Sequence, residues 1–104
     1  MILIHMLRYI TGNTWSVVQS GRNRNIFRLV HIDTLDDHFV MLYYVCDSDG
    51  DTLIYNEKSK SDIYTLQRRV TPKQGRVVLF DGSYYHTGEQ PINNIRCVVN
   101  YNLR

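Results

Sequence analysis

Short runs of β-branched and aromatic residues, each ended by Gly, Asn or Asp, recur along the whole chain. Runs of this kind at close, regular spacing are typical of β-strands joined by turns, and helical periodicity is absent. Because many short strands pack as a sandwich or close into a barrel, the sequence predicts an all-β fold with little or no helix. The expected strands are residues 2–10, 14–19, 25–31, 38–46, 52–56, 63–70, 76–80, 84–87 and 95–103.

Two of these segments carry further information. Residues 39–45 are apolar or aromatic at every position, which predicts a central strand covered on both sides. Residues 95–103 alternate instead, so one face of that strand carries Arg96, Val98, Asn100 and Asn102. An arginine there is either a surface residue of an amphipathic strand or the partner of a buried anion, which a bidentate guanidinium suits.

The size and charge of the chain limit its function class. With 104 residues, 43% of them hydrophobic, we expect a single domain over residues 1–104. The formal net charge of +2 is too near neutral to predict a nucleic-acid partner, and the nearby Arg22, Arg24 and Arg28 are interpreted as solvated charge. No apolar stretch is long enough for a membrane span. The two cysteines show no metal-binding or disulfide pattern and no signal peptide is evident, so we expect a soluble, cytoplasmic protein.

The strongest chemical signal is His31-Ile32-Asp33. In an extended segment the side chains at positions i and i+2 point the same way, so His31 and Asp33 could hold one metal ion. His86, which follows another apolar run, would complete a set of two imidazoles and one carboxylate that suits non-haem Fe(II). Their metal-binding atoms should then lie within roughly 4 Å of one another. The alternative is a surface turn that happens to carry two polar residues.

Other acidic and histidine residues give weaker signals. Residues 47–51, Asp-Ser-Asp-Gly-Asp, are similar to part of a calcium loop, but the spacing to a closing Glu is wrong for an EF-hand. We interpret this segment as a tight hairpin turn. His5 and His38 have no acidic partner at metal-ligand spacing and are expected to be structural or exposed.

From His31 to its end, the chain resembles the catalytic half of the prolyl-4-hydroxylase-like oxygenases that depend on Fe(II) and 2-oxoglutarate. It is most similar to the small members found in bacteriophage and marine viral genomes. The matching stretches, in family order, are His31-Ile32-Asp33-Thr34, Leu42-Tyr43-Tyr44-Val45, Asp49-Gly50-Asp51-Thr52, Pro72-Lys73-Gln74-Gly75-Arg76, Leu79-Phe80-Asp81, His86-Thr87-Gly88, and Arg96 with Val98-Val99-Asn100. The matching region covers about three quarters of the chain, whereas residues 1–25 match only loosely.

This resemblance implies a fold, a site and a reaction. The fold would be a double-stranded β-helix, a jelly-roll barrel. Iron would be held by His31, Asp33 and His86, and Arg96 would bind the distal carboxylate of 2-oxoglutarate. The reaction would use O2, with ascorbate as an auxiliary reductant, to hydroxylate a peptide or small-molecule substrate and release succinate and CO2. The phage-type relatives imply a location inside an infected host cell.

The chain departs from the family pattern at two points. Many relatives have Ser or Thr two residues after the co-substrate arginine, where this chain has Val98. Tyr44 or Asn100 could supply the missing hydrogen bond to 2-oxoglutarate, although a tyrosine in a central strand is also an ordinary core residue. In addition, no helix-length pattern precedes His31, whereas most relatives have helices there that cover one sheet. An apolar sheet face would therefore be left uncovered. We therefore expect a homodimer organised around residues 2–10.

Two other function classes stay open at this stage. A non-catalytic β-barrel that binds a metal, a ligand or another protein could carry the same metal-binding residues. A cupin-like barrel is disfavoured, because cupins mostly build their site with His-x-His rather than with His-x-Asp. The identity of the hydroxylated substrate is beyond fold-level analogy.

Overall fold

The computed structural model describes residues 2–4, 14–20 and 30–104, and all regular structure in these residues is β. The strands are β1 (Ile2–Ile4), β2 (Thr14–Ser20), β3 (Phe39–Tyr44), β4 (Thr52–Tyr55), β5 (Leu66–Val70), β6 (Val77–Asp81), β7 (His86–Gly88) and β8 (Arg96–Leu103). The predicted all-β fold is confirmed for this part of the chain. Within the same residues there is no helix of the length and apolarity needed to cross a membrane.

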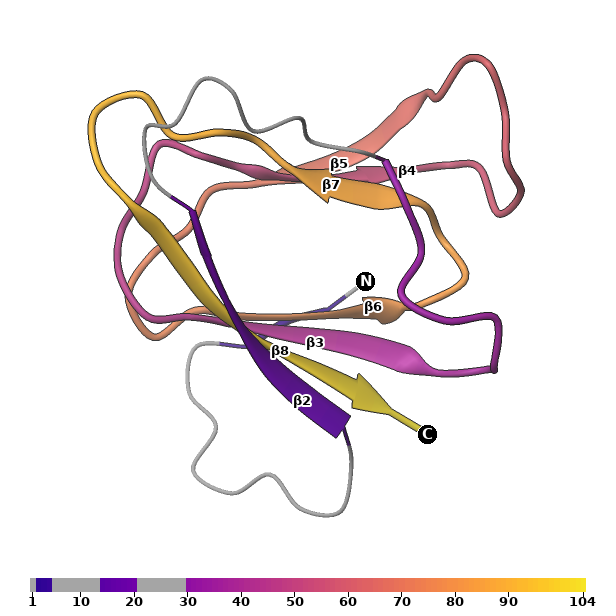
Figure 1. Cartoon of the computed structure of the whole chain (residues 1–104), viewed down its shortest axis with the longest axis horizontal. Coiled ribbons are helices and arrows are strands. Elements are labelled where there is room, and N and C mark those ends of the chain that lie inside the picture. The colour runs from indigo at the N-terminus through magenta and orange to yellow at the C-terminus, as the bar shows by residue number, and fades with distance from the viewer. Residues whose placement is uncertain (1, 5–13, 21–29) are drawn as a thin grey trace.

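The strands form two antiparallel sheets that lie one above the other (Figure 1). The larger sheet has the order β1-β6-β3-β8-β2, and the smaller sheet has the order β5-β4-β7. From β3 onward the chain crosses repeatedly between the layers, with β3, β6 and β8 in the larger sheet and β4, β5 and β7 in the smaller one. Residues distant in sequence are therefore brought together between the sheets.

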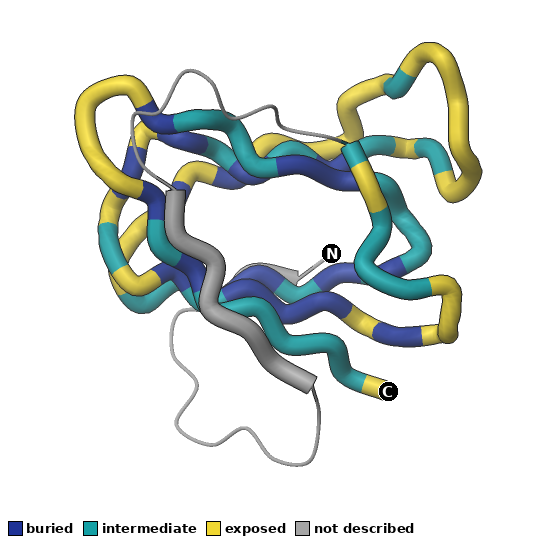
Figure 2. Tube along the Cα trace, in the orientation of Figure 1, coloured by how far each residue is buried: buried dark blue, intermediate teal, exposed yellow. Residues whose placement is uncertain are grey.

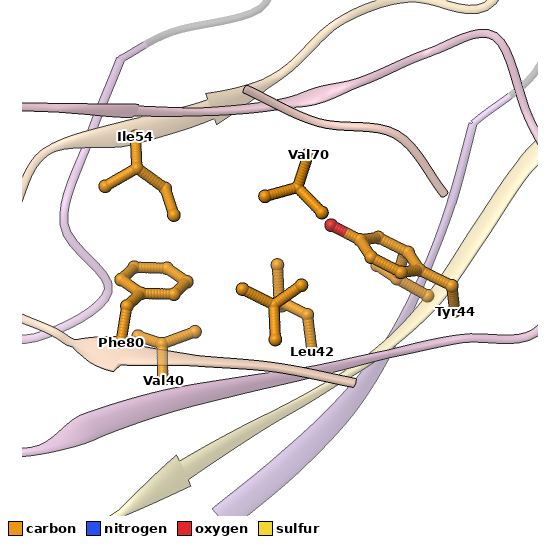
Figure 3. Packing of buried hydrophobic residues seen from close by; sticks show 8 residues of the cluster. Val40, Leu42, Tyr44, Ile54, Val70 and Phe80 are labelled. Atoms are coloured by element: carbon orange, nitrogen blue, oxygen red, sulfur yellow. The ribbon is translucent and has the colours of Figure 1, made fainter. Parts of the chain in front are cut away.

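The hydrophobic core fills the space between the two sheets. Val40, Leu42 and Tyr44 alternate along β3 and point toward the smaller sheet, from which Ile54 and Val70 point back (Figure 3). The register of β3 with β6 adds Phe80 and Val78 on the same side of the larger sheet. Figure 2 shows the result, with buried segments facing one another across the sandwich and exposed loops at its ends.

The outward face of β3 is covered at its centre. Met41 is 3% exposed and Val77, on the neighbouring strand, is fully buried, whereas Phe39 and Val45 at the two ends of the apolar run are exposed. The prediction that residues 39–45 form a strand covered on both sides is thus confirmed for its middle.

Two sequence predictions fall largely outside the described residues. Of the strand expected at residues 25–31, only the last two residues are described, and His31 forms an isolated bridge rather than a continuous strand. Of the segment expected to organise a dimer, residues 2–4 form β1 and pair with β6. The homodimer stays a prediction.

The interpretation of residues 47–51 as a hairpin turn was wrong. β3 and β4 lie in different sheets, so this segment is a crossing loop between the layers. Its acidic residues serve as anchors: the carboxylate of Asp49 accepts hydrogen bonds from the backbone N–H groups of Ile92 and Asn93, each at 3.0 Å. These contacts tie the loop to the segment that leads into β8.

The packing between the sheets predicts the effect of shortening Ile54. This side chain is fully buried and carries the smaller sheet's contribution to the core, so Ile54→Ala should lower the free energy of unfolding by about 2–5 kcal/mol. Ile63, which is 75% exposed, provides the matched control, and Ile63→Ala should change stability by no more than about 0.5 kcal/mol. Urea denaturation of both variants measures the difference, and equal effects would contradict this description of the core.

Candidate metal centre

Two backbone hydrogen bonds join the segment around His31 to β7. The N–H of His31 donates to the carbonyl oxygen of His86, and the N–H of His86 donates to the carbonyl oxygen of His31, each at 2.9 Å. This isolated antiparallel bridge brings the two imidazole rings to a centroid separation of 4.6 Å. The chain from residue 30 then passes from the smaller sheet to the start of β3 (Figure 1), closing one end of the sandwich.

The carboxylate of Asp33 lies between the two imidazoles. One oxygen, Oδ1, is 3.3 Å from Nε2 of His31 and 3.6 Å from Nε2 of His86. A set of potential metal-binding atoms, one from each residue, lies within 4.8 Å. The predicted cluster is therefore present, slightly wider than the expected 4 Å, although Asp33 lies in a bend rather than in an extended strand.

Hydrogen bonding orients the ring of His86. Its Nδ1 lies 3.1 Å from the carbonyl oxygen of Tyr84, which can only accept, so this nitrogen carries the proton. The ring therefore directs Nε2 toward Asp33, and a bound metal ion would take the place of any proton on this nitrogen. Phe80 packs edge-on against the same ring at 5.1 Å, and the His86 side chain is 7% exposed.

The environment keeps Asp33 ionised. Burial by itself raises the pKa of this carboxyl group, but hydrogen bonds with His31 and His86 outweigh burial and hold the pKa well below its ordinary value. A further hydrogen bond from Asn100 acts in the same direction. An ionised carboxylate beside an oriented imidazole is a suitable pair of ligands for a divalent cation.

The three residues fit a metal ion in donor type and in spacing. Donor atoms that each lie about 2.1 Å from an ion and meet at right angles are about 3 Å apart. The two separations from Asp33 would need to shorten only slightly, whereas the widest spacing in the cluster, up to 4.8 Å, would need to shorten more. Two imidazoles and one carboxylate on one side of an ion leave its other positions open. His31, whose side chain is 50% exposed, lies on the accessible side of the cluster.

A small cavity of about 80 Å³ adjoins the cluster and has Arg96 in its wall. Its lining comes from both sheets: His31, Leu42, Thr52, His86, Thr87, Gly88, Arg96, Val98 and Asn100. Arg96 is 4% exposed, so the sequence alternative of a surface arginine is excluded. The two imidazoles and the guanidinium therefore border the same small cavity.

Neighbouring groups hold the guanidinium of Arg96 in place. Its Nε donates to the carbonyl oxygen of Gly50 at 3.0 Å, and Nη2 donates to the hydroxyl of Thr52 at 2.7 Å. A Cβ atom added to Gly88 would lie 2.7 Å from the central carbon of the guanidinium, which is too close. The absence of a side chain at position 88 is what allows Arg96 to lie against β7.

The side-chain oxygen of Thr52 also accepts a hydrogen bond from the hydroxyl group of Tyr44, at 2.6 Å. Tyr44 is fully buried and is not part of the cavity wall, so its proton has this one described acceptor. Arg96 donates to the same oxygen, and Thr52 borders the cavity. The Thr52 hydroxyl thus links the buried tyrosine to the arginine in the cavity wall.

The remaining predicted residue, Asn100, is directed at the metal cluster. Its Nδ2 donates to Oδ2 of Asp33 at 3.1 Å, and the side chain also borders the cavity. Val98 is 2% exposed and contributes an apolar part of the wall. Binding of 2-oxoglutarate by Tyr44 or Asn100 stays a prediction, but both side chains already have partners.

Two residues of this site had no role in the sequence interpretation. Thr52 and Gly88 both belong to motifs that carry the family resemblance, yet a threonine at a strand start and a glycine near a histidine have many ordinary explanations. Their roles depend on how the two sheets face each other, which spacing along the chain does not show.

No protein-family model matches the sequence, and no curated protein matches it either.

The metal cluster predicts a specific loss when Asp33 is changed. Asp33→Asn keeps the shape of the side chain but removes its charge, and Asp33→Ala removes the ligand altogether, so both should weaken binding of Co(II) or Fe(II) by more than about 100-fold. Asp36→Asn is the control, because Asp36 is exposed and pairs with Arg104 away from the cluster. Anaerobic calorimetric titration measures all three variants. Unchanged affinity in the Asp33 variants would show that the ion binds elsewhere.

Proposed function

We propose that the chain is an Fe(II)- and 2-oxoglutarate-dependent oxygenase that hydroxylates a peptide or small-molecule substrate. The observation that carries this proposal is the single cavity bordered by both imidazoles of the cluster and by a buried arginine. A small dicarboxylic keto acid could reach the metal at one end and pair with a guanidinium at the other. Few other ligand types need both features so close together.

The fold supports this assignment. The strand neighbours β8-β3-β6 and β7-β4-β5, joined by connections that cross between two antiparallel sheets everywhere except between β4 and β5, are compatible with a jelly-roll. The bridge between His31 and His86 would add the segment before β3 to the edge of the smaller sheet, as a further strand would be added. In a double-stranded β-helix of this kind the metal would lie between the sheets near one end.

In this proposal the bound metal and the protein have different roles. A bound Fe(II) would supply the redox chemistry that couples decarboxylation of 2-oxoglutarate by O2 to hydroxylation of a C–H bond, giving succinate and CO2. The protein holds Asp33 ionised, presents Nε2 of His86 and leaves the opposite side of the cluster open. The small cavity excludes bulk water and orients the co-substrate, while the exposed side near His31 is left for the substrate.

Arg96 and Thr52 form the proposed subsite for the distal carboxylate. The guanidinium supplies charge-assisted hydrogen bonds, and the Thr52 hydroxyl supplies the donor that relatives place two residues after the arginine. The cavity volume is far below the several hundred Å³ of a drug-sized site, which agrees with a ligand as small as 2-oxoglutarate.

The test is whether 2-oxoglutarate binds in a manner that depends on both the metal and Arg96. Anaerobic calorimetry of Fe(II)-loaded protein should detect 2-oxoglutarate binding, and Arg96→Ala should weaken it by about 2–5 kcal/mol, with Arg96→Lys rescuing poorly. With air admitted, the wild type should release succinate slowly even without its substrate. Metal binding without any 2-oxoglutarate binding would favour the alternative, a non-catalytic metal-binding β-sandwich.

Gly88→Ala tests the same subsite without removing a functional group. The added methyl group would overlap the guanidinium, so Arg96 must shift and 2-oxoglutarate binding should weaken by about 10-fold or more, while metal affinity is retained. Gly82→Ala is not a suitable control, since a Cβ atom there would overlap His38. Lys73→Ala, at an exposed residue outside the cavity, serves instead and should leave 2-oxoglutarate binding unchanged.

A further inference from the structure

The two oxygens of Asp33 have different partners. Oδ1 faces Nε2 of both His31 and His86, at 3.3 and 3.6 Å, whereas Oδ2 accepts the hydrogen bond from Nδ2 of Asn100 at 3.1 Å. Asn100 reaches Asp33 from β8 in the larger sheet, although the two residues are 67 positions apart in sequence. Oδ2 of the carboxylate is thus hydrogen-bonded to the amide of Asn100, while Oδ1 faces the two imidazoles.

The amide of Asn100 has one workable orientation. Its NH2 group must face the carboxylate, because its carbonyl oxygen would be repelled there. In this orientation Oδ1 of Asn100 is buried and has no hydrogen-bond partner within the described part of the chain. An unpaired buried oxygen lowers stability, and an apolar residue of similar size would avoid that cost but would leave Oδ2 of Asp33 without this donor. What Asn100 contributes is the orientation of Asp33.

This orientation matters because a carboxylate can bind a metal through one oxygen or through two. One-oxygen binding by Asp33, together with two imidazoles, leaves three positions of an octahedral ion open. Two-oxygen binding would leave only two. A keto acid that chelates through its carboxylate and carbonyl oxygens would then occupy both, and no position would remain for O2.

We propose that Asn100 keeps Asp33 a one-oxygen ligand by occupying its second oxygen, and thereby keeps a coordination position of the metal open. Asn100 is in this view a positioning residue that acts through Asp33. The inference rests on the proposed metal site and assigns the residue a task other than binding the co-substrate directly.

The test compares Asn100→Leu with Asn102→Leu in Co(II)-loaded protein. Asn102 lies two residues along the same strand and also has a buried carbonyl oxygen without a described partner, but no hydrogen bond to Asp33 is described for it. Both leucine variants therefore remove an unpaired buried oxygen, and Asn100→Leu alone also removes the donor to Asp33. Asn100→Leu should retain Co(II) binding and a melting temperature close to that of the wild type. Its Co(II) absorption should weaken, as expected for a higher coordination number, and 2-oxoglutarate binding should fall about 10–100-fold. Asn102→Leu should match the wild type in its Co(II) absorption and in its affinity for 2-oxoglutarate.

Each other outcome has a definite meaning. Spectra and 2-oxoglutarate affinities that are the same for both leucine variants would overturn the role of Asn100 while leaving the metal site intact. Loss of stability and of metal binding together in Asn100→Leu would also overturn it, because Asn100 would then be a structural residue. If the wild type itself bound no Co(II), the proposed metal site and the proposed function would both be wrong. The titration of the wild type with Co(II) alone distinguishes this outcome from an error about Asn100.

Discussion

The pair of backbone hydrogen bonds between His31 and His86 is the contact on which the site depends. It fixes a segment without regular structure of its own to the edge of the smaller sheet, and it does so at the two residues whose side chains are needed. Because the rest of the segment then crosses to β3, Asp33 is left between the imidazoles rather than on the outer surface. The cluster is thus a product of strand pairing rather than of a local motif.

The interior of the sandwich contains an apolar core and, beside it, a group of hydrogen-bonded polar side chains. Apolar side chains such as Val40, Ile54 and Phe80 join the two sheets, and Phe80 also supports the ring of His86. Beside them lies a buried polar group, made of Tyr44, Thr52 and Arg96, whose described hydrogen bonds are mutually consistent. Buried polar networks of this kind are costly unless they are satisfied, so the arginine and its partners constrain how the two sheets can face each other.

Much of this arrangement could be predicted from alternation and spacing alone. The period of two in β8 put Arg96 and Asn100 on the same face but did not decide whether that face is buried, and the apolar run at residues 39–45 marked the central strand. The crossing of residues 45–51 was missed because a turn between two strands looks the same whether they pair or lie in opposite sheets. The partners of Thr52 and Asn100 were missed for a related reason, since Thr52 contacts a residue 44 positions away and Asn100 contacts a residue 67 positions away.

The proposed function requires that one small cavity and the adjoining cluster hold both a metal ion and 2-oxoglutarate. A crystal structure of the protein soaked anaerobically with Mn(II) and 2-oxoglutarate tests this most directly, because the anomalous signal locates the ion without reference to any assumed reaction. The account predicts one Mn(II) peak among Nε2 of His31, Oδ1 of Asp33 and Nε2 of His86, with the acid extending from it to Arg96. An ion bound elsewhere, or an acid outside the cavity, would contradict it.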